Sequence, residues 1–181
     1  QSYAAGRTYN NYPGNALDLS AFSDNQYDIT LLLGPLYHLY TKRQAPGAGR
    51  GHPRHKQGGI IFAAYVISDG CLLDEGFNRG NINAAEYIKT AAGPETFAAK
   101  SEPKDLFELV RKEDIDDLMS IFPTTRLHYA ASDGCALLIR EAIDKMDDEI
   151  QLYLKYHYAT CERKDLTGIT SHAIDIFQKT N

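Results

Sequence analysis

Two nearly uninterrupted apolar runs in the first half of the chain predict buried β-strands. Residues 27–34 read YDITLLLG, and residues 60–66 read IIFAAYV. Runs of this kind, without polar alternation, are typical of parallel strands that are buried on both faces of a sheet. The first run ends at a Gly-Pro pair. The second follows Gly58–Gly59, a pair that predicts a helix-to-strand turn.

The segment that connects these two strands should contain a helix, but part of its sequence disfavours one. Adjacent parallel strands need a crossover, which is normally a helix. Residues 35–59 must provide it, and residues 35–40 are compatible with a helix start. Residues 46–53, however, read PGAGRGHP. Inside a helix, Gly costs about 1 kcal/mol and Pro about 3 kcal/mol relative to Ala. The local sequence therefore opposes the architecture that its flanks require.

Helical periodicity dominates the second half of the chain. Apolar spacings of three and four predict two short helices within residues 104–122, with Ser101 as an N-cap. A further helix is predicted around residues 138–146. Another begins near residue 150, capped by Asp147 or Asp148, and its apolar stripe includes Tyr153, His157 and Cys161.

Two alternating segments, residues 124–131 and 171–177, predict further strands. Strands separated by helical segments indicate the α/β fold class. The sequence contains no internal repeat and no second domain boundary, so residues 1–181 are interpreted as one domain. Residues 71–122 are interpreted as a helical cap insertion within it.

Composition and charge argue against a transmembrane segment and against nucleic acid as a partner. The 181 residues include 19 Lys+Arg and 24 Asp+Glu, a formal net charge of −5, and 43% are hydrophobic. No apolar run approaches the roughly 20 residues that span a bilayer, which argues against a transmembrane segment. The mild net acidity disfavours nucleic acid as a partner. The stretch between Asp28 and Asp69 is carboxylate-free and basic, with Lys42, Arg43, Arg50, Arg54 and Lys56.

The cysteines and the short motifs give little catalytic signal. Cys71, Cys135 and Cys161 are odd in number and far apart, which favours reduced thiols in a cytoplasmic protein. The sequence lacks H-E-x-x-H, a Cys pair, a G-x-S-x-G elbow and a Walker lysine loop. No metal site is predicted.

The end of the first buried strand is the most informative candidate site. Ligands of open α/β sheets bind at the carboxyl ends of strands, where Gly34 would let a ligand approach the backbone. Tyr37 offers an aromatic face and His38 a switchable donor. The alternative is that both rings merely pack. Upstream, Asn15–Ala16 offers an amide and a backbone N–H that suit an adenine edge, although Gly-Asn is also a common turn.

Longer runs resemble a known family. Residues 14–41 (GNALDLSAFSDNQYDITLLLGPLYHLYT) and 57–77 (QGGIIFAAYVISDGCLLDEGF) resemble class I S-adenosylmethionine-dependent methyltransferases. The resemblance is closer to the bacterial branch of methyltransferase domain types 11 and 12. Residues 94–134 and 152–179 resemble the cap and closing elements of that branch. The match rests on these long runs rather than on any single short motif.

The resemblance implies a Rossmann-like sheet in a three-layer αβα arrangement, with strand order 3-2-1-4-5-7-6. Residues 9–14 would end strand 3. Strands 4, 5, 6 and 7 would be residues 27–33, 60–66, 124–131 and 171–177, respectively.

The resemblance also implies S-adenosylmethionine as cofactor and methyl transfer to a small-molecule acceptor. The cofactor-binding positions would be Asn15 and Ala16 for the adenine, and Leu33, Gly34 and His38 for the methionine half. Tyr37, Tyr65 and Asp69 would face the acceptor. No residue is identified as the base; the pocket candidates are His38, Tyr65, Asp69, Tyr153 and His157.

Two departures from the family pattern stand out. The glycine-rich loop after strand 1 and the acidic residue that ends strand 2 would both precede Gln1. The resemblance therefore predicts a methyltransferase that is incomplete at its N-terminus. Strand 4 would then be an exposed apolar edge that can pair with another chain or with itself.

The second departure is the crossover itself. A one-base shift of degenerate codons for residues 46–56 permits L-x-x-A-E-A-I-R-V-T-K, an amphipathic helix of the kind the crossover requires. We hypothesise a local frameshift there, and the coding DNA decides the question; the alternative is a genuine loop.

The leading functional interpretation is a methyltransferase of small molecules, with reduced or absent activity in this form. The alternatives are a non-catalytic interaction fragment that pairs with a partner chain through the exposed edge, and the product of a broken gene. The sequence does not indicate the identity of the methyl acceptor.

Overall fold

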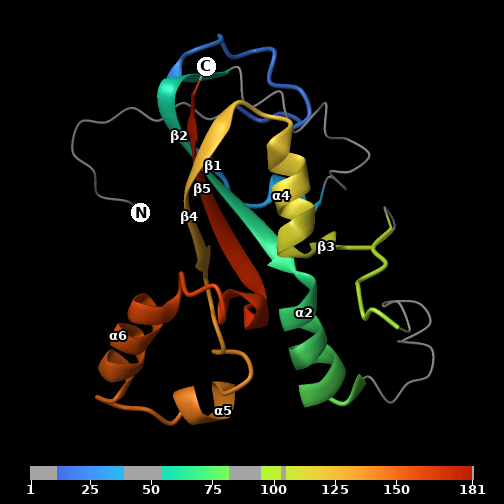
Figure 1. Cartoon of the computed structure of the whole chain (residues 1–181), viewed down its shortest axis with the longest axis vertical. Coiled ribbons are helices and arrows are strands. Elements are labelled where there is room, and N and C mark those ends of the chain that lie inside the picture. The colour runs from blue at the N-terminus through green and yellow to red at the C-terminus, as the bar shows by residue number, and fades with distance from the viewer. Residues whose placement is uncertain (1–11, 39–53, 82–94, 103–104, 181) are drawn as a thin grey trace.

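The computed structural model describes residues 12–38, 54–81, 95–102 and 105–180. These residues build a five-stranded mixed sheet in which the main order is β1-β2-β5-β4 (Figure 1). A short strand, β3, pairs with the end of β2. The strands are β1 (Tyr27–Leu32), β2 (His55–Ile67), β3 (Leu109–Val110), β4 (Thr124–Ala131) and β5 (His172–Lys179).

The two apolar runs form adjacent parallel strands, as predicted. Ile29 of β1 pairs with Ile60 of β2, and Leu32 pairs with Ala63. The crossover between the strands begins with η1 (Pro35–Tyr37), a short 3-10 turn. Residues 39–53, which include most of the hypothesised frameshift, lie outside the described residues.

The prediction that Gly58–Gly59 forms a turn before the strand was wrong. Both glycines lie inside β2, which already begins at His55. The pairing with β1 is irregular at this point, because the register shifts between Tyr27 and Ile29. Gly58 has a φ of +76°, and a Cβ on Gly59 would lie 2.9 Å from the carbonyl oxygen of Lys56. The pair therefore shapes a bulge rather than a turn.

The two alternating segments form antiparallel partners. β4 matches its predicted bounds, and β5 begins one residue later and ends two residues later than predicted. β5 pairs with β2 on one side and β4 on the other, antiparallel to both. The order β1-β2-β5-β4 is the order 4-5-7-6 that the family resemblance implies. Residues 12–14, expected near the end of strand 3, form no strand, and residues 9–11 lie outside the described ranges.

The helical elements follow the predictions only in part. α2 (Ser68–Cys71) continues into a π-helical segment, η3 (Leu72–Asn78). The others are α4 (Lys112–Ser120), α5 (Arg140–Ile143), α6 (Ile150–Thr160) and the 3-10 turn η5 (Thr167–Ile169). No side chain caps the start of α6, so the prediction of an aspartate cap was wrong.

Of the two helices predicted within residues 104–122, only α4 exists in the described residues. Leu109 and Val110 form β3 instead, because they pair with Val66 and Ile67 at the open edge of β2. This pairing overrides a weak local helical pattern. The expected cap, Ser101, accepts the backbone N–H of Leu109 at 2.9 Å and so fixes the start of β3.

The core lies between the sheet and α4, which runs along one face of the sheet (Figure 1). Ile115 of α4 and Phe177 of β5 are each 1% exposed. They pack in one cluster with Ala63, Tyr65 and Ala173. On the opposite face, Ile29 and Leu31 of β1 are 59% and 60% exposed, and within the described ranges β1 has β2 as its sole neighbour.

Candidate functional site

Three strands end at one edge of the sheet, which we call the carboxyl edge. β1 is parallel to β2, and β4 runs the same way because both β2 and β4 are antiparallel to β5. Figure 1 shows α2, α5 and α6 gathered at this edge. Open α/β sheets bind their ligands there, so the candidate site is built from the residues that follow β1, β2 and β4.

The residues after β1 present an open surface. The Leu33 side chain is 54% exposed. Gly34 has a φ of +155°, a conformation that favours glycine, and a Cβ at this position would meet only the Tyr37 hydroxyl, 3.7 Å away. Within the described residues, the space beside Gly34 is therefore open, and its use as a binding turn stays a prediction.

Tyr37 and His38 form an aromatic cluster with Phe107. The ring centroids of Tyr37 and His38 lie 4.8 Å apart, and those of His38 and Phe107 lie 5.3 Å apart. Nδ1 of His38 donates to the carbonyl oxygen of Leu106 at 2.9 Å, and the N–H of Glu108 donates to the carbonyl oxygen of Tyr37 at 2.7 Å. The two rings thus join the end of β1 to the segment that leads into β3.

The contacts of Asn15 are local in the described part of the chain. Its side-chain oxygen accepts the N–H of Leu17 at 2.9 Å, and its carbonyl oxygen accepts the N–H of Asp18 at 2.8 Å. This is an Asx-type turn. Asn15 is exposed and Ala16 half-buried.

Tyr65 and Asp69 have different environments: Tyr65 is buried in the core, whereas the Asp69 side chain is partly exposed. Tyr65 belongs to the core beneath α4 and is 2% exposed, and its hydroxyl has no hydrogen-bond partner among the described residues. Burial, reinforced by the nearby Asp175 carboxylate, raises the pKa of Tyr65 far above its usual value. Asp69 accepts a hydrogen bond from Arg111 at 2.7 Å, and this bond raises the pKa of Arg111. The ion pair ties the start of α2 to the start of α4.

The Asp133 carboxylate, which the sequence did not indicate as a site residue, organises the end of β4. Oδ1 of Asp133 accepts the N–H groups of Ser171 and His172 at 3.0 and 3.1 Å, and it also contacts the hydroxyl of Thr170. Oδ2 of Asp133 lies 3.1 Å from Nδ1 of His172. The available signals were a Ser-Asp-Gly turn after one predicted strand and a Ser-His pair at the start of another, but only the fold brings them together.

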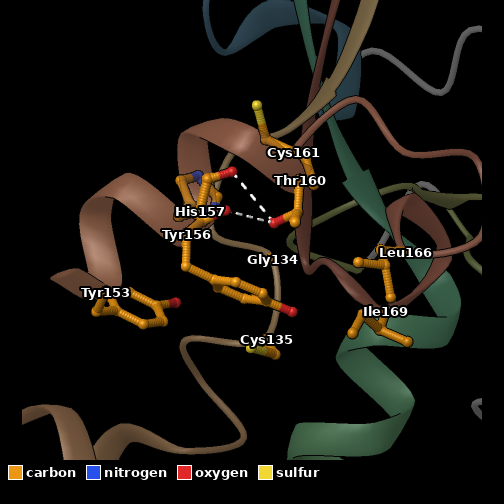
Figure 2. Close-up of a pocket in the computed structure, with 10 residues that line it drawn as sticks. Gly134, Cys135, Tyr153, Tyr156, His157, Thr160, Cys161, Leu166 and Ile169 are labelled. Atoms are coloured by element: carbon orange, nitrogen blue, oxygen red, sulfur yellow. Dashed lines mark hydrogen bonds between the residues drawn. The ribbon is translucent and has the colours of Figure 1, made fainter.

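A small cavity lies beside this turn (Figure 2). It has a volume of about 30 Å³, roughly the space of one water molecule. Its lining includes two of the pocket candidates, Tyr153 and His157, together with Cys135 and Cys161. Thr160 also lines the cavity, and its hydroxyl donates to the carbonyl oxygens of Tyr156 and His157. The cavity is too small for a nucleoside cofactor.

A larger open hollow, about 610 Å³, lies at the opposite edge, near the start of β1. Tyr12, Phe22 and Tyr27 line it, and their rings make successive edge-on contacts. Neither this hollow nor the small cavity includes an expected cofactor residue.

Two further properties bear on the chemistry. Burial raises the pKa of the Cys71 thiol to about 11, which makes it a poor nucleophile. Among the described residues, no group of three or more His, Cys, Asp or Glu side chains is arranged to hold a metal ion. In the same residues, no helix has the length and apolarity needed to cross a membrane.

The comparisons with known proteins rest on structure alone. No family model matches the sequence, and no curated protein matches it. Among solved structures, a SAM-dependent methyltransferase from Methanosarcina mazei superposes with a TM-score of 0.51 at 12% identity. The match covers 92% of this chain and 65% of that one. A SAM-dependent methyltransferase from Archaeoglobus fulgidus gives 0.51 at 11% identity, covering 93% and 66%.

These similarities establish the fold. The chain has the Rossmann-like class I SAM-dependent methyltransferase fold, with an open mixed α/β sheet. It spans just under two thirds of the length of these two similar structures.

Proposed function

We propose that this chain is a methyltransferase that uses S-adenosylmethionine and a small-molecule acceptor. The observation that carries the proposal is the strand order β1-β2-β5-β4 with an antiparallel β5, in a fold shared with the two SAM-dependent methyltransferases. Fold alone does not determine activity, so the residues at the carboxyl edge must also suit the cofactor.

The residues after β1 fit one half of such a cofactor. The exposed apolar side chain of Leu33 and the open backbone at Gly34 suit the methionine half, which carries the sulfonium group. His38 is exposed beside them and is held by Leu106. Asn15 and Ala16 would contact the adenine. When bound, the cofactor supplies the methyl group; these residues bind and orient it.

Tyr37, Tyr65 and Asp69 remain the proposed acceptor-side residues. Tyr37 and Asp69 follow the ends of β1 and β2, and Tyr65 lies in the core cluster with Ile115 of α4. The three free cysteines support a reducing, cytoplasmic location. The alternative of a non-catalytic interaction fragment gains no support from the similar structures, which are both methyltransferases.

Calorimetric titration with S-adenosylhomocysteine, the demethylated product of the cofactor, tests the proposal. We expect saturable binding that Gly34→Val weakens at least tenfold, because a β-branched side chain would strain the backbone and cover the open surface. Gly14→Val is the matched control, since a Cβ at Gly14 would meet no described residue within 4 Å. No heat of binding with the wild-type chain would refute the proposed function.

We further propose that the chain associates with itself through β1. The specific observation is that Ile29 and Leu31 lie exposed on a strand with one neighbour in the described residues. Unpaired edge strands with apolar side chains are sites of pairing between chains.

A further inference from the structure

Asp133 and His172 meet at the carboxyl edge although they are 39 positions apart in the chain. Asp133 lies two residues beyond β4, and His172 is the first residue of β5. Nδ1 of His172 lies 3.1 Å from Oδ2 of Asp133. Because an ionised carboxylate can only accept, Nδ1–H is the donor, and the neutral ring keeps its lone pair on Nε2.

The Asp133 carboxylate is held in place independently of the imidazole. Its other oxygen accepts two backbone N–H groups, from Ser171 and His172, and contacts the hydroxyl of Thr170. Thr170 is fully buried, and its hydroxyl also accepts the N–H of Gly134 at 3.1 Å. A carboxylate fixed in this way orients an imidazole, as outer partners do for catalytic and metal-binding histidines.

A second pair of a histidine and a carboxylate, His128 with Glu162, differs from the Asp133–His172 pair in its burial and its position. Nδ1 of His128 lies 3.0 Å from Glu162, and both side chains are about half exposed. His172 is exposed to the same extent, 53%, whereas the Asp133 side chain is only 22% exposed. Glu162 makes no other hydrogen bond within the described residues, and His128 lies in the middle of β4 rather than at the carboxyl edge.

The pairing of β5 with β2 places His172 at the carboxyl end of β2. His172 pairs with Val66, and the N–H of Ile67 donates to the carbonyl oxygen of Ser171 at 2.8 Å. His172 therefore lies beside the last residues of β2, just before α2 begins. Paired residues share a face of the sheet, so His172 lies on the face opposite Tyr65 and α4.

We propose that His172, positioned by Asp133, is the base that receives the proton of the methyl acceptor, which is a small hydroxyl or thiol compound. This inference rests on the proposed function. In the transfer, the acceptor's oxygen or sulfur bonds to the methyl carbon while the bond from that carbon to the sulfonium sulfur breaks. The electron pair of the broken bond stays on the sulfonium sulfur, and the acceptor's proton moves to Nε2 of His172.

The first test reads the imidazole directly and needs no substrate. Long-range ¹H–¹⁵N spectra of the full chain at pH 8 should show His172 protonated at Nδ1 and bare at Nε2. In Asp133→Asn, the amide keeps one oxygen for the Ser171 and His172 N–H groups and turns its NH₂ toward the ring. The proton should then move to Nε2, while the His128 signals stay unchanged. A wild-type His172 protonated at Nε2 overturns the proposal.

The second test measures methyl transfer with tritium-labelled S-adenosylmethionine and a protein-free small-molecule extract of a bacterial culture. We expect His172→Gln to lower the initial rate of label transfer, at equal enzyme and extract concentrations, by about 10²- to 10⁴-fold, the usual contribution of a general base. Its affinity for S-adenosylhomocysteine should be unchanged by calorimetry. His128→Gln, the matched control, should transfer label like the wild type.

The outcomes separate the two proposals. A His172→Gln variant with wild-type transfer overturns the role of His172 and leaves the methyltransferase proposal intact. A wild-type chain that neither binds S-adenosylhomocysteine nor transfers label overturns the proposed function, and the inference falls with it. If the wild type binds S-adenosylhomocysteine but transfers no label, the first test decides the role of His172. A proton on Nδ1 supports that role, and a proton on Nε2 overturns it.

Discussion

Arg126 of β4 neutralises a carboxylate that has no access to water. The Asp175 side chain is fully buried, and Arg126 reaches it through Nε at 2.7 Å and Nη2 at 2.6 Å. Burial raises the pKa of Asp175 above its ordinary value, and the hydrogen bonds from Arg126 oppose that rise. The same bonds raise the pKa of Arg126. The two charges compensate each other in the folded state, and removing either partner destabilises the fold.

Removing Arg126 should therefore lower the stability of the folded state. We expect Arg126→Met to lower the free energy of unfolding by about 3–5 kcal/mol at pH 8, because it strands a buried carboxylate. Without the arginine, the folded-state pKa of Asp175 rises further above its unfolded value. The folded state then binds the proton more tightly, so the loss should shrink as the pH falls through that raised pKa.

Urea unfolding at pH 8 and pH 5 measures both effects. Arg163→Met serves as the control, because the Arg163–Asp165 pair is exposed on both sides and should leave the unfolding midpoint unchanged. A loss of equal size at the two pH values would contradict this account of Asp175.

At the scale of elements, Gly70 decides how closely α2 approaches the start of β5. A Cβ on Gly70 would lie 2.0 Å from the carbonyl oxygen of Thr170 and 2.7 Å from the nitrogen of Ser171. Both contacts are with backbone, which cannot rotate away. α2 can follow β2 directly only because this residue has no side chain.

Gly70→Ala should therefore be strongly destabilising. We expect a loss of at least about 3 kcal/mol, comparable to severe overpacking, together with disturbed amide signals at Thr170 and Ser171. Gly168→Ala, two residues from Thr170, is the matched control, since a Cβ there would meet nothing within 4 Å. Thermal unfolding of the two variants makes the comparison, and a Gly70→Ala chain as stable as the Gly168→Ala chain would refute the packing argument.

The sequence predicted the elements whose pattern is local and strong. β1, β2 and β4 were found because apolar runs and alternation need no knowledge of the neighbours. β3 was missed because Leu109 and Val110 become a strand only through the open edge of β2. Gly58–Gly59 was misinterpreted because the bulge depends on the register with β1.

In the candidate site too, the sequence indicated the residues that depend on local pattern and missed those that depend on the fold. The residues after β1 could be proposed from sequence because they adjoin a recognisable strand end. The Asp133–His172 pair could not, since the two residues meet only after β5 inserts between β2 and β4. The buried position of Tyr65 likewise follows from the placement of α4, which strand periodicity does not reveal.

At the scale of the whole molecule, the exposed edge should govern association. We expect the wild-type chain to form dimers or larger species as its concentration rises, and Leu31→Lys to shift sedimentation toward the monomer, because a lysine on an edge strand opposes pairing. Leu152→Lys on α6 is the matched control: Leu152 is 71% exposed, against 60% for Leu31. Association that is absent in the wild type, or equally reduced in both variants, would contradict pairing through β1.

The Asp133 carboxylate has one further consequence, which concerns the connection between β4 and β5. Residues 134–169, with α5 and α6, leave the sheet at Asp133 and return to the same point at Thr170, Ser171 and His172. One side chain anchors both ends of this excursion, and its interior also contacts β4: the N–H of Ala131 donates to the carbonyl oxygen of Cys161 at 2.7 Å, and His128 pairs with Glu162. The Asp133 carboxylate thus closes a loop of 36 residues, numbers 134–169, at the point where His172 begins β5, so the same side chain sets the ends of that loop and the position of the imidazole.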